Sequence, residues 1–456
     1  MTKKRVPLLP AALGLTAEAA LMFLFLVVLD LSPRLPLLGG CLIASGIALG
    51  CGFTCKEAAA GMWQGIRRSL GAIVILLLIG ALMGVWLAAG VVPAMVYYGL
   101  KLISPRFFLA STMLVCAVVS MALGSWGTAG TVGLAFMGMA QAMGIPPAMT
   151  AGAVISGSYV GDKLSPMADS TNLASAVAEV DIFDNIRNIF KVAAPMLVLC
   201  LGLYGVLGLK YGGSMSPAAM ENIRLMQTTL SSLFRLDLRT FLPLLILVGC
   251  ILCKLSAPLS IAAAALAGGI CAVIWQGAAP GDILRAALSG YVGQSGTAQV
   301  DALLSAGGIT SMLYSVSIVV LAMAYGGVME STGQMETLVA PLVKKLRDQV
   351  GLMAAAVLTC VGVNIVLPDQ YIAIALPGRL YAAQFDKHGL SRKDLALGIG
   401  VGGALTSALV PWNTCGVFMS SVLGVGTFAY LPYAFYNYAM LPAAVIYAAI
   451  KKKKRG

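Results

Sequence analysis

The segment FFLASTMLVCAVVSMALGSWGTAGTVGLAFMGMAQAMGIPPAMTAGAVISGSYVG runs from Phe107 to Gly161 without one formally charged side chain. A membrane-crossing helix needs about 20 predominantly apolar residues. At about 1.5 Å per residue, this run is long enough to cross roughly 30 Å of hydrocarbon at least twice. A second uncharged run extends from Leu395 to Ile450. The two runs predict an all-α polytopic membrane protein.

The composition of the whole chain excludes a soluble enzyme. Hydrophobic residues make up 59% and charged residues 11% of the 456 residues, whereas soluble domains have roughly 25% charged residues. The single histidine, His388, lies in a polar stretch, and no H-E-x-x-H metal set is present. Cys250 and Cys253 form a C-x-x-C without a second pair to complete a metal site. We therefore expect neither an enzyme nor a bound cofactor. A passive channel is the alternative, and the observation of unitary currents would distinguish it from a transporter.

Basic residues gather at the two ends of the chain. Lys3, Lys4 and Arg5 open it, and the run 451–455 closes it, which together makes eight of the 30 basic residues. The positive-inside rule places such flanking charge in the cytoplasm, so both termini are expected there. No aromatic residues interleave with these charges, so they predict no nucleic-acid partner.

The apolar run 6–31 is too long for a signal-peptide core and predicts an uncleaved first span.

Apolar runs and their punctuation predict about 10 to 13 membrane segments, some of them re-entrant. The most polar interior stretch, 210–240, predicts a linker between a first transmembrane half, 1–209, and a second, 241–456. The predicted segments lie near 12–31, 37–53, 69–90, 107–123, 131–143, 147–160, 192–209, 241–254, 258–276, 311–329, 350–367, 395–410 and 428–449.

A short motif occurs once in each half. Trp126, Thr128 and Gly130 have the same W-x-T-x-G spacing as Trp412, Thr414 and Gly416. Transporters are often built from two repeats, frequently inverted, whose broken helices meet at mid-membrane. We therefore expect two repeats with broken or re-entrant helices, although a three-residue match can also arise by chance.

In hydrocarbon, backbone without helical partners is tolerated only where it lines a cavity, so polar stretches broken by Gly and Pro mark candidate sites. The first is Gly124–Thr131, GSWGTAGT, in the middle of the long uncharged run. Ser125 and Thr128 add hydroxyl oxygens to the freed carbonyls, a set that suits dehydrated Na⁺. Close helix packing through small residues is the alternative.

The second candidate site is the stretch Gly157–Ala174, GSYVGDKLSPMADSTNLA. An unbroken helix would place Asp162 and Asp169 on one face, but Pro166 interrupts the helical hydrogen bonds and predicts a bend. Asp169 precedes the neutral oxygens of 170–172, and hard cations prefer such ligands. Asp162 can form an ion pair with the adjacent Lys163 or bind an arriving cation; an ordinary exposed loop is the alternative.

The third candidate site combines two stretches of the second half, 367–381 and 406–416. Asp369 follows twenty uncharged residues, and prolines at 368, 377 and 411 each remove a helical hydrogen bond. Neutral oxygens are offered by Thr406, Ser407, Asn413 and Thr414. Asp369 caps the next helix in the alternative interpretation.

Coupling to protons then falls to carboxylates, because His388 lies in a solvated loop. A desolvated carboxylate holds a proton tightly, and a nearby cation releases it, so Na⁺ and H⁺ compete for one group. We expect Asp162, Asp169 and Asp369 to bind Na⁺ or H⁺. Such competition is sufficient for exchange.

The motifs resemble those of the NhaC-type sodium/proton antiporter family over roughly residues 70–440. They are GSWGTAGTVG, GDKLSPMADSTNLA, DQYIAIALPGR and PWNTCG, with VPAMVYYGLKLISPRFF and YLPYAFYN around them. The resemblance implies a multi-pass antiporter of the bacterial plasma membrane that exchanges Na⁺ for H⁺ by alternating access, built from inverted repeats. Carried over residue by residue, it implies a first-half site of Asp162, Ser165, Asp169, Thr171 and Asn172, and a second-half site of Asp369, Thr406, Ser407, Trp412, Asn413 and Thr414.

The chain departs from the family pattern at two places. The positions that correspond to an acidic Glu-Asp-Ser-Gly stretch are Gly400, Val401, Gly402 and Gly403, and Pro368 stands where a small residue is common. Some relatives resemble exchangers of malate for lactate. The missing carboxylate makes a Na⁺- or H⁺-coupled exchanger of small organic anions the alternative function, with Lys163 and Arg379 as the cations best placed to meet a carboxylate. Further expected partners are the lipid bilayer and a second copy of the chain in a homodimer.

Overall fold

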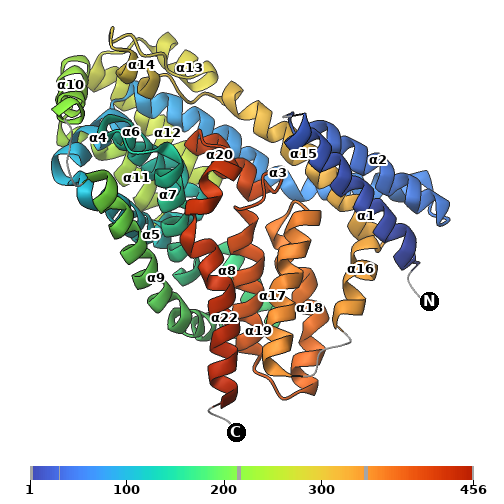
Figure 1. Ribbon diagram of the computed structural model, residues 1–456. Helices are drawn as coiled ribbons and strands as arrows, with labels where there is room; N and C mark the ends of the chain where they lie inside the picture. Colours follow the sequence, from blue (N-terminus) through green and yellow to red (C-terminus); the bar gives the residue numbers. More distant parts are fainter. Residues whose placement is uncertain (1–3, 30, 213–216, 344–347, 454–456) are drawn as a thin grey trace.

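A computed structural model describes residues 4–29, 31–212, 217–343 and 348–453. Within these ranges the regular structure is entirely helical, and many of the helices lie alongside one another in a bundle (Figure 1). The predicted all-α polytopic architecture is confirmed.

In the described residues up to 233, the chain forms ten α-helices and a 3-10 turn, Pro105–Phe107. α5 continues through a widened turn, 129–133, into α6, and a similar widened turn, 24–28, follows α1. The ten helices are α1 (Leu8–Phe23), α2 (Arg34–Gly50), α3 (Cys55–Ala88), α4 (Val91–Leu102), α5 (Phe108–Thr128), α6 (Leu134–Met143), α7 (Pro147–Leu164), α8 (Asp169–Ala178), α9 (Ile182–Gly212) and α10 (Pro217–Leu233).

From residue 238 on, the described residues add twelve α-helices and two 3-10 turns, Leu238–Phe241 and Leu431–Tyr433. Widened turns follow α12 at 272–276 and α19 at 400–405. The helices are α11 (Leu242–Leu252), α12 (Ala257–Cys271), α13 (Pro280–Ser289), α14 (Ala298–Leu304), α15 (Ile309–Ser331), α16 (Gln334–Val343), α17 (Gln349–Val366), α18 (Gln370–Lys387), α19 (Arg392–Ile399), α20 (Thr414–Leu423), α21 (Thr427–Tyr430) and α22 (Phe435–Lys453).

Among the described residues, seven helices are long and apolar enough to cross a membrane, and a bent pair makes an eighth. The bent pair joins Thr414–Leu423 to Thr427–Tyr433 at an angle of 86°. The sequence predicted 10 to 13 segments because it also took the segments that form α2, α7, α11, α19 and α22 as spans and divided Pro105–Met143 into two. The chain is a multi-pass membrane protein.

Small residues allow the long helices to approach one another closely. A Cβ on Gly65 of α3 would lie 2.0 Å from the carbonyl oxygen of Met323 in α15, and one on Gly327 would lie 2.2 Å from the carbonyl oxygen of Gly61. In the same way, Cβ atoms on Gly157 and Gly161 of α7 would meet backbone oxygens of α5 at 2.2 Å. Backbone contact of this kind is how helices associate in lipid, and it fixes α7 against α5.

The predicted linker region contains a helix of its own, α10, which packs against α4 and α6. The division into two halves and their relation as inverted repeats stay predictions. The two parts of the chain do meet directly, because α8 packs against α18 and α19. The candidate site lies near this meeting of early and late helices.

Candidate functional site

The first candidate residues lie where α7 ends and α8 begins. α7 ends at Leu164, and α8 starts at Asp169, so the predicted bend around Pro166 is confirmed. Ser165 holds the turn: its hydroxyl donates to the carbonyl oxygen of Met121 in α5 at 2.7 Å and accepts from the Met167 N–H at 3.2 Å. The turn is thereby tied to the neighbouring helix.

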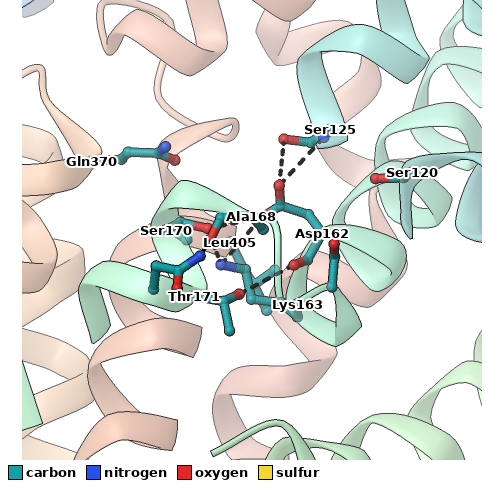
Figure 2. Close-up of polar contacts among 12 residues, drawn as sticks. Ser120, Ser125, Asp162, Lys163, Ala168, Ser170, Thr171, Gln370 and Leu405 are labelled. Carbon is teal, nitrogen blue, oxygen red and sulfur yellow. Dashed lines mark hydrogen bonds and ion pairs between the residues drawn. The ribbon is translucent and has the colours of Figure 1, made fainter. Parts of the chain in front are cut away.

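Asp162 is the centre of the polar contacts at this break. Its Oδ1 accepts from the backbone N–H of Ser125 at 3.3 Å and from the Ser125 hydroxyl at 3.4 Å. Its Oδ2 accepts from the Ser170 hydroxyl at 2.8 Å (Figure 2). The N–H of Ser125 is turned toward Asp162 because Gly124, with φ 69° and ψ 174°, breaks α5 just before it. Three broken helical segments therefore meet at one carboxylate.

Lys163 is the cation of this group and is fully buried. Its Nζ lies 3.3 Å from Asp162 Oδ2 and donates to Ser170 Oγ at 2.5 Å. The predicted ion pair between adjacent residues therefore forms. A buried charge is costly unless it is paired, so Asp162 and Lys163 stabilise each other.

The other candidates in the first half have different surroundings. Thr171 donates to the backbone oxygen of Asp162 at 3.1 Å, which joins it to the same group. Asn172 donates to the carbonyl oxygens of Pro166 and Ala168, so it stabilises the turn. Asp169 is exposed at the first turn of α8. The hydroxyl of Thr128 is buried and has no hydrogen-bond partner in the part of the chain that the structure describes.

Asp369 is buried at the start of α18, where it acts as a helix cap. Its Oδ1 accepts from the N–H groups of Tyr371 at 2.6 Å and Ile372 at 3.1 Å. The hydrogen bonds of Asp369 are therefore those of a helix cap, as the alternative interpretation of the sequence expected. The residue is only 7% exposed, so it does not lie at a solvated interface. Neither Asp369 nor Asp169 hydrogen-bonds to Asp162 or Lys163 in the described ranges.

The candidate side chains of the second half form hydrogen bonds with two amides that were not among the predicted site residues, Asn364 and Gln370. Asn364 donates to Thr406 Oγ1 at 2.9 Å and accepts from Asn413 at 3.0 Å. The Gln370 oxygen accepts from Ser407 at 3.2 Å. A signal existed for both, since Asn364 is an amide deep in an apolar helix, α17, whose other amide, Gln349, is its first residue, and Gln370 adjoins Asp369.

Thr414 and the second tryptophan continue this network. The Thr414 N–H donates to the carbonyl oxygen of Pro368 at 3.0 Å, and the Trp412 indole donates to the carbonyl oxygen of Ile365 at 2.7 Å. Both bonds join the stretch 406–416 to the end of α17, so the two stretches of the third candidate site do come together.

Tyr159 lies close to the second-half group. It is one turn before Asp162 on α7, and its buried hydroxyl is near Ser407 and Cys415 but makes no hydrogen bond within the described residues. Cys415 in turn lies 3.2 Å from the Gln370 oxygen. Figure 2 shows Ser125 and Ser170 around Asp162, and Gln370 apart from that group. The first-half carboxylate and the second-half amides are therefore separate groups.

Alkali ions are held by oxygen atoms, and this site offers mainly neutral ones. No group of three or more His, Cys, Asp or Glu side chains that would hold a metal is present among the described residues. Around Asp162 the available ligands are one carboxylate and two serine hydroxyls. Such a set suits a monovalent cation better than a tightly held divalent one.

Gly400, Gly402 and Gly403 form part of the widened turn after α19, together with Val401. A Cβ on Gly402 would lie 2.9 Å from Cys360 Cβ, and one on Gly403 would lie 3.0 Å from the backbone of Ala373. α17 and α18 therefore pack directly onto this turn. Glycine at these two positions serves close packing, and no carboxylate is available there.

A polytopic helical bundle with a buried carboxylate at broken helices defines a secondary transporter. A family model described as "Na+/H+ antiporter family" matches residues 1–162 and 157–452. The chain belongs to this family. The prediction of the family and of a transporter rather than an enzyme is confirmed.

Three relatives show the range of the family. A malate-2H⁺/Na⁺-lactate antiporter of Bacillus subtilis is 33% identical over 94% of this chain and 91% of its own. The Na⁺/H⁺ antiporter NhaC of Alkalihalophilus pseudofirmus is 36% identical over 91% and 90% of the two chains. The arginine/ornithine antiporter ArcD of Halobacterium salinarum is 34% identical over 95% and 90%.

A solved structure of Neisseria gonorrhoeae MtrF, described as one of a class of antimetabolite efflux pumps, aligns with 94% of this chain and 97% of its own at 11% identity and a TM-score of 0.47. A likeness this distant adds nothing to the site.

Proposed function

We propose that the protein exchanges Na⁺ for H⁺ across the membrane and that Asp162 is the carboxylate that binds them in turn. The observation that supports this most is the buried pair of Asp162 and Lys163, held by Ser125 and Ser170 at the ends of broken helices. A buried ionisable residue inside a membrane bundle is a functional site by default. The Na⁺/H⁺ antiporters among the relatives, at 32 to 36% identity, support the choice of ions.

The geometry suggests how competition arises. Na⁺ that approaches Asp162 Oδ2 and Ser170 Oγ meets Lys163 Nζ, which already contacts both atoms. The two cations cannot share the carboxylate at such short distances, because they repel each other strongly in a medium of low dielectric constant. Na⁺ binding therefore requires Lys163 to move away or to lose its proton, and either event links sodium to a change at the ammonium group.

Alternating access is the proposed route. The helix breaks before Ser125, at Pro166 and in 400–413 give segments that can change direction without losing whole helices. The ions bound at Asp162 then reach either side as these segments and the α8–α18 contact rearrange. Asp169 and Asp369 stay predicted as further ion ligands.

The experiment that tests Na⁺/H⁺ exchange uses purified protein in liposomes with a pH-sensitive dye inside. A NaCl pulse is expected to move the internal pH, whereas KCl at the same concentration leaves it unchanged. Liposomes without protein measure the pH change that is due to passive ion leakage. Equal responses to Na⁺ and K⁺, or none, would reject the proposal.

A second candidate function is exchange of small organic anions coupled to Na⁺ or H⁺. Lys163 favours it, because a fully buried ammonium group can meet a substrate carboxylate once Asp162 is protonated. The malate/lactate antiporter among the relatives supports the substrate class. In the same liposomes, malate or lactate would be required for the pH change, and Na⁺ alone would give none.

We further propose that the protein lies in the bacterial inner membrane with both termini in the cytoplasm. Basic residues at the described ends support this, with Lys4 and Arg5 before α1 and Lys451 and Lys452 at the end of α22. The homodimer stays a proposal, which native mass spectrometry of the detergent-solubilised protein would test.

A further inference from the structure

A further buried carboxylate, Glu18 in α1, lies outside the transport site. Glu18 is 5% exposed, and neither of its carboxylate oxygens has a hydrogen-bond partner among the described residues. It lines a cavity of about 210 Å³ bounded by α1, α2, α15 and α17 and by the segments at 412 and 428. An unpaired carboxylate in such a place needs a proton or a cation.

The packing of α2 makes room for this carboxylate. A Cβ added to Gly40 would lie 2.2 Å from Glu18 Oε2, so the carboxylate lies directly against the backbone of α2 and would have to move to make room for a side chain there. The carboxylate therefore lies between α1 and α2.

The rest of the lining decides which cation fits. It is aliphatic and aromatic and includes Leu37, Tyr325, Trp412 and Phe428. An alkali ion needs several oxygen ligands, which this lining does not supply beyond the carboxylate and one phenol. An organic ammonium ion brings its own apolar body, pairs its charge with the carboxylate and is attracted by aromatic faces.

We propose that the Glu18 cavity binds a small lipophilic organic ammonium ion. Its size limits the ligand, since 210 Å³ is below the roughly 300 Å³ at which sites for drug-sized molecules begin. The ligand reaches it from the bilayer, because Phe23 and Phe428 at its mouth are 61% and 57% exposed on the surface of a membrane protein. A bound ligand contacts Trp412, next to Asn413 of the transport site.

The test uses dicyclohexylcarbodiimide, a lipid-soluble reagent that modifies carboxyl groups in apolar surroundings, on the full-length protein in liposomes. Mass spectrometry of the α1 peptide measures the modified fraction at Glu18. Benzylammonium chloride is expected to lower this fraction at least five-fold. Benzyl alcohol, which has the same ring and no charge, and NaCl at equal concentration are expected to leave it unchanged.

Three outcomes would overturn the proposal. Equal protection by benzyl alcohol would make the cavity merely apolar, and equal protection by NaCl would make it an alkali-ion site. Absence of modification at Glu18 would show that the carboxylate is not reached from the bilayer. The proposal does not depend on Na⁺/H⁺ exchange, so its failure leaves the transport site untouched.

A variant pair supplies a second measurement. Glu18→Gln keeps the shape of the side chain and removes the charge, and Glu221→Gln changes an exposed glutamate of α10 in the same way. Benzylammonium is expected to raise the melting temperature of the wild type and of E221Q but not of E18Q. An equal rise in all three would place the binding elsewhere and overturn the proposal.

Discussion

Asp162 receives hydrogen bonds from segments on both sides of it in the chain, and it also carries the charge that offsets Lys163. Asp162→Asn removes that charge and leaves a buried ammonium group unpaired. The loss of one partner of a buried pair costs roughly 3–5 kcal/mol. We therefore expect a lower melting temperature in detergent and loss of Na⁺-dependent pH change in liposomes.

The double variant Asp162→Asn with Lys163→Gln separates the two effects. It leaves no uncompensated charge, so the melting temperature is expected to return most of the way to that of the wild type. Transport is expected to stay absent, because the ion-binding carboxylate is still missing. Restored exchange in the double variant would contradict a role for Asp162 in binding the ions.

Asp369 permits a sharper distinction between an ion ligand and a helix cap. Asparagine also caps helices well, whereas replacing a cap by alanine costs about 1 kcal/mol. We expect Asp369→Asn to keep the melting temperature but to lower exchange, because the charge that binds the ion is lost, and Asp369→Ala to lower both. Full exchange in Asp369→Asn would contradict the predicted ion-binding role and leave Asp369 as a helix cap.

At the scale of the element, the break in α5 is what turns Ser125 toward Asp162. Gly124 has φ 69° and ψ 174°, a conformation that is essentially restricted to glycine. A Cβ there would meet nothing closer than Asp162 Oδ1 at 3.8 Å, so Gly124→Ala acts through the backbone, at a cost of order 1–3 kcal/mol. We expect the segment to change direction and exchange in liposomes to fall strongly.

Gly144 is the matched control for this change. It ends α6 with φ 67°, and an added Cβ would meet nothing within 4 Å. Gly144→Ala also places a side chain at a positive φ, in the left-handed region that other residues enter at a cost of roughly 1–2 kcal/mol, and it does not touch the turn that presents Ser125, so we expect exchange to be retained. A similar loss of exchange in both variants would show that general strain, and not the position of Ser125, is responsible.

The helix breaks could be predicted from the sequence because their causes are local. Glycines at 124 and 127 and the proline at 166 disfavour a helix whatever surrounds them, and the structure has breaks at 124 and around 166. The neighbouring Asp162 and Lys163 could likewise be considered as a pair, because no other charges lie close to them in the chain.

The partners of these residues could not be predicted in the same way. Ser125 lies 37 residues before Asp162, and Asn364 lies 49 before Asn413, so each contact depends on how distant helices pack. Asp369 shows the reverse difficulty. Asp369 follows an uncharged run, which suggested an ion ligand. In the structure its hydrogen bonds are to backbone N–H groups at the start of the helix that it precedes, α18.

At the scale of the whole molecule, charged groups gather at one end of the bundle. Lys451 pairs with Asp394 at 2.7 Å and Lys452 with Asp348 at 3.3 Å, so the loops before α17 and α19 lie beside the end of α22. Lys393 pairs with Asp184 at the start of α9. Figure 1 shows these helix ends together near the C-terminus. This end is the one expected in the cytoplasm.

The direction of α9 predicts the side of the membrane on which α10 lies, because α10 follows the end of α9 in the chain. Asn188, near the start of α9, bonds to Tyr447 near the end of α22, and Tyr204 further along α9 bonds to Tyr433 before α22. α9 and α22 thus run antiparallel across the bundle, so α10 and the end of α22 belong on opposite sides of the membrane. In a variant without the ten native cysteines, Glu221→Cys in intact cells is expected to react with a membrane-impermeant maleimide, and Lys452→Cys only in everted vesicles. Labelling of both cysteines from the same side would contradict the antiparallel arrangement of α9 and α22. Labelling of Lys452→Cys in intact cells and of Glu221→Cys only in everted vesicles would contradict the cytoplasmic termini, but it would agree with the antiparallel arrangement.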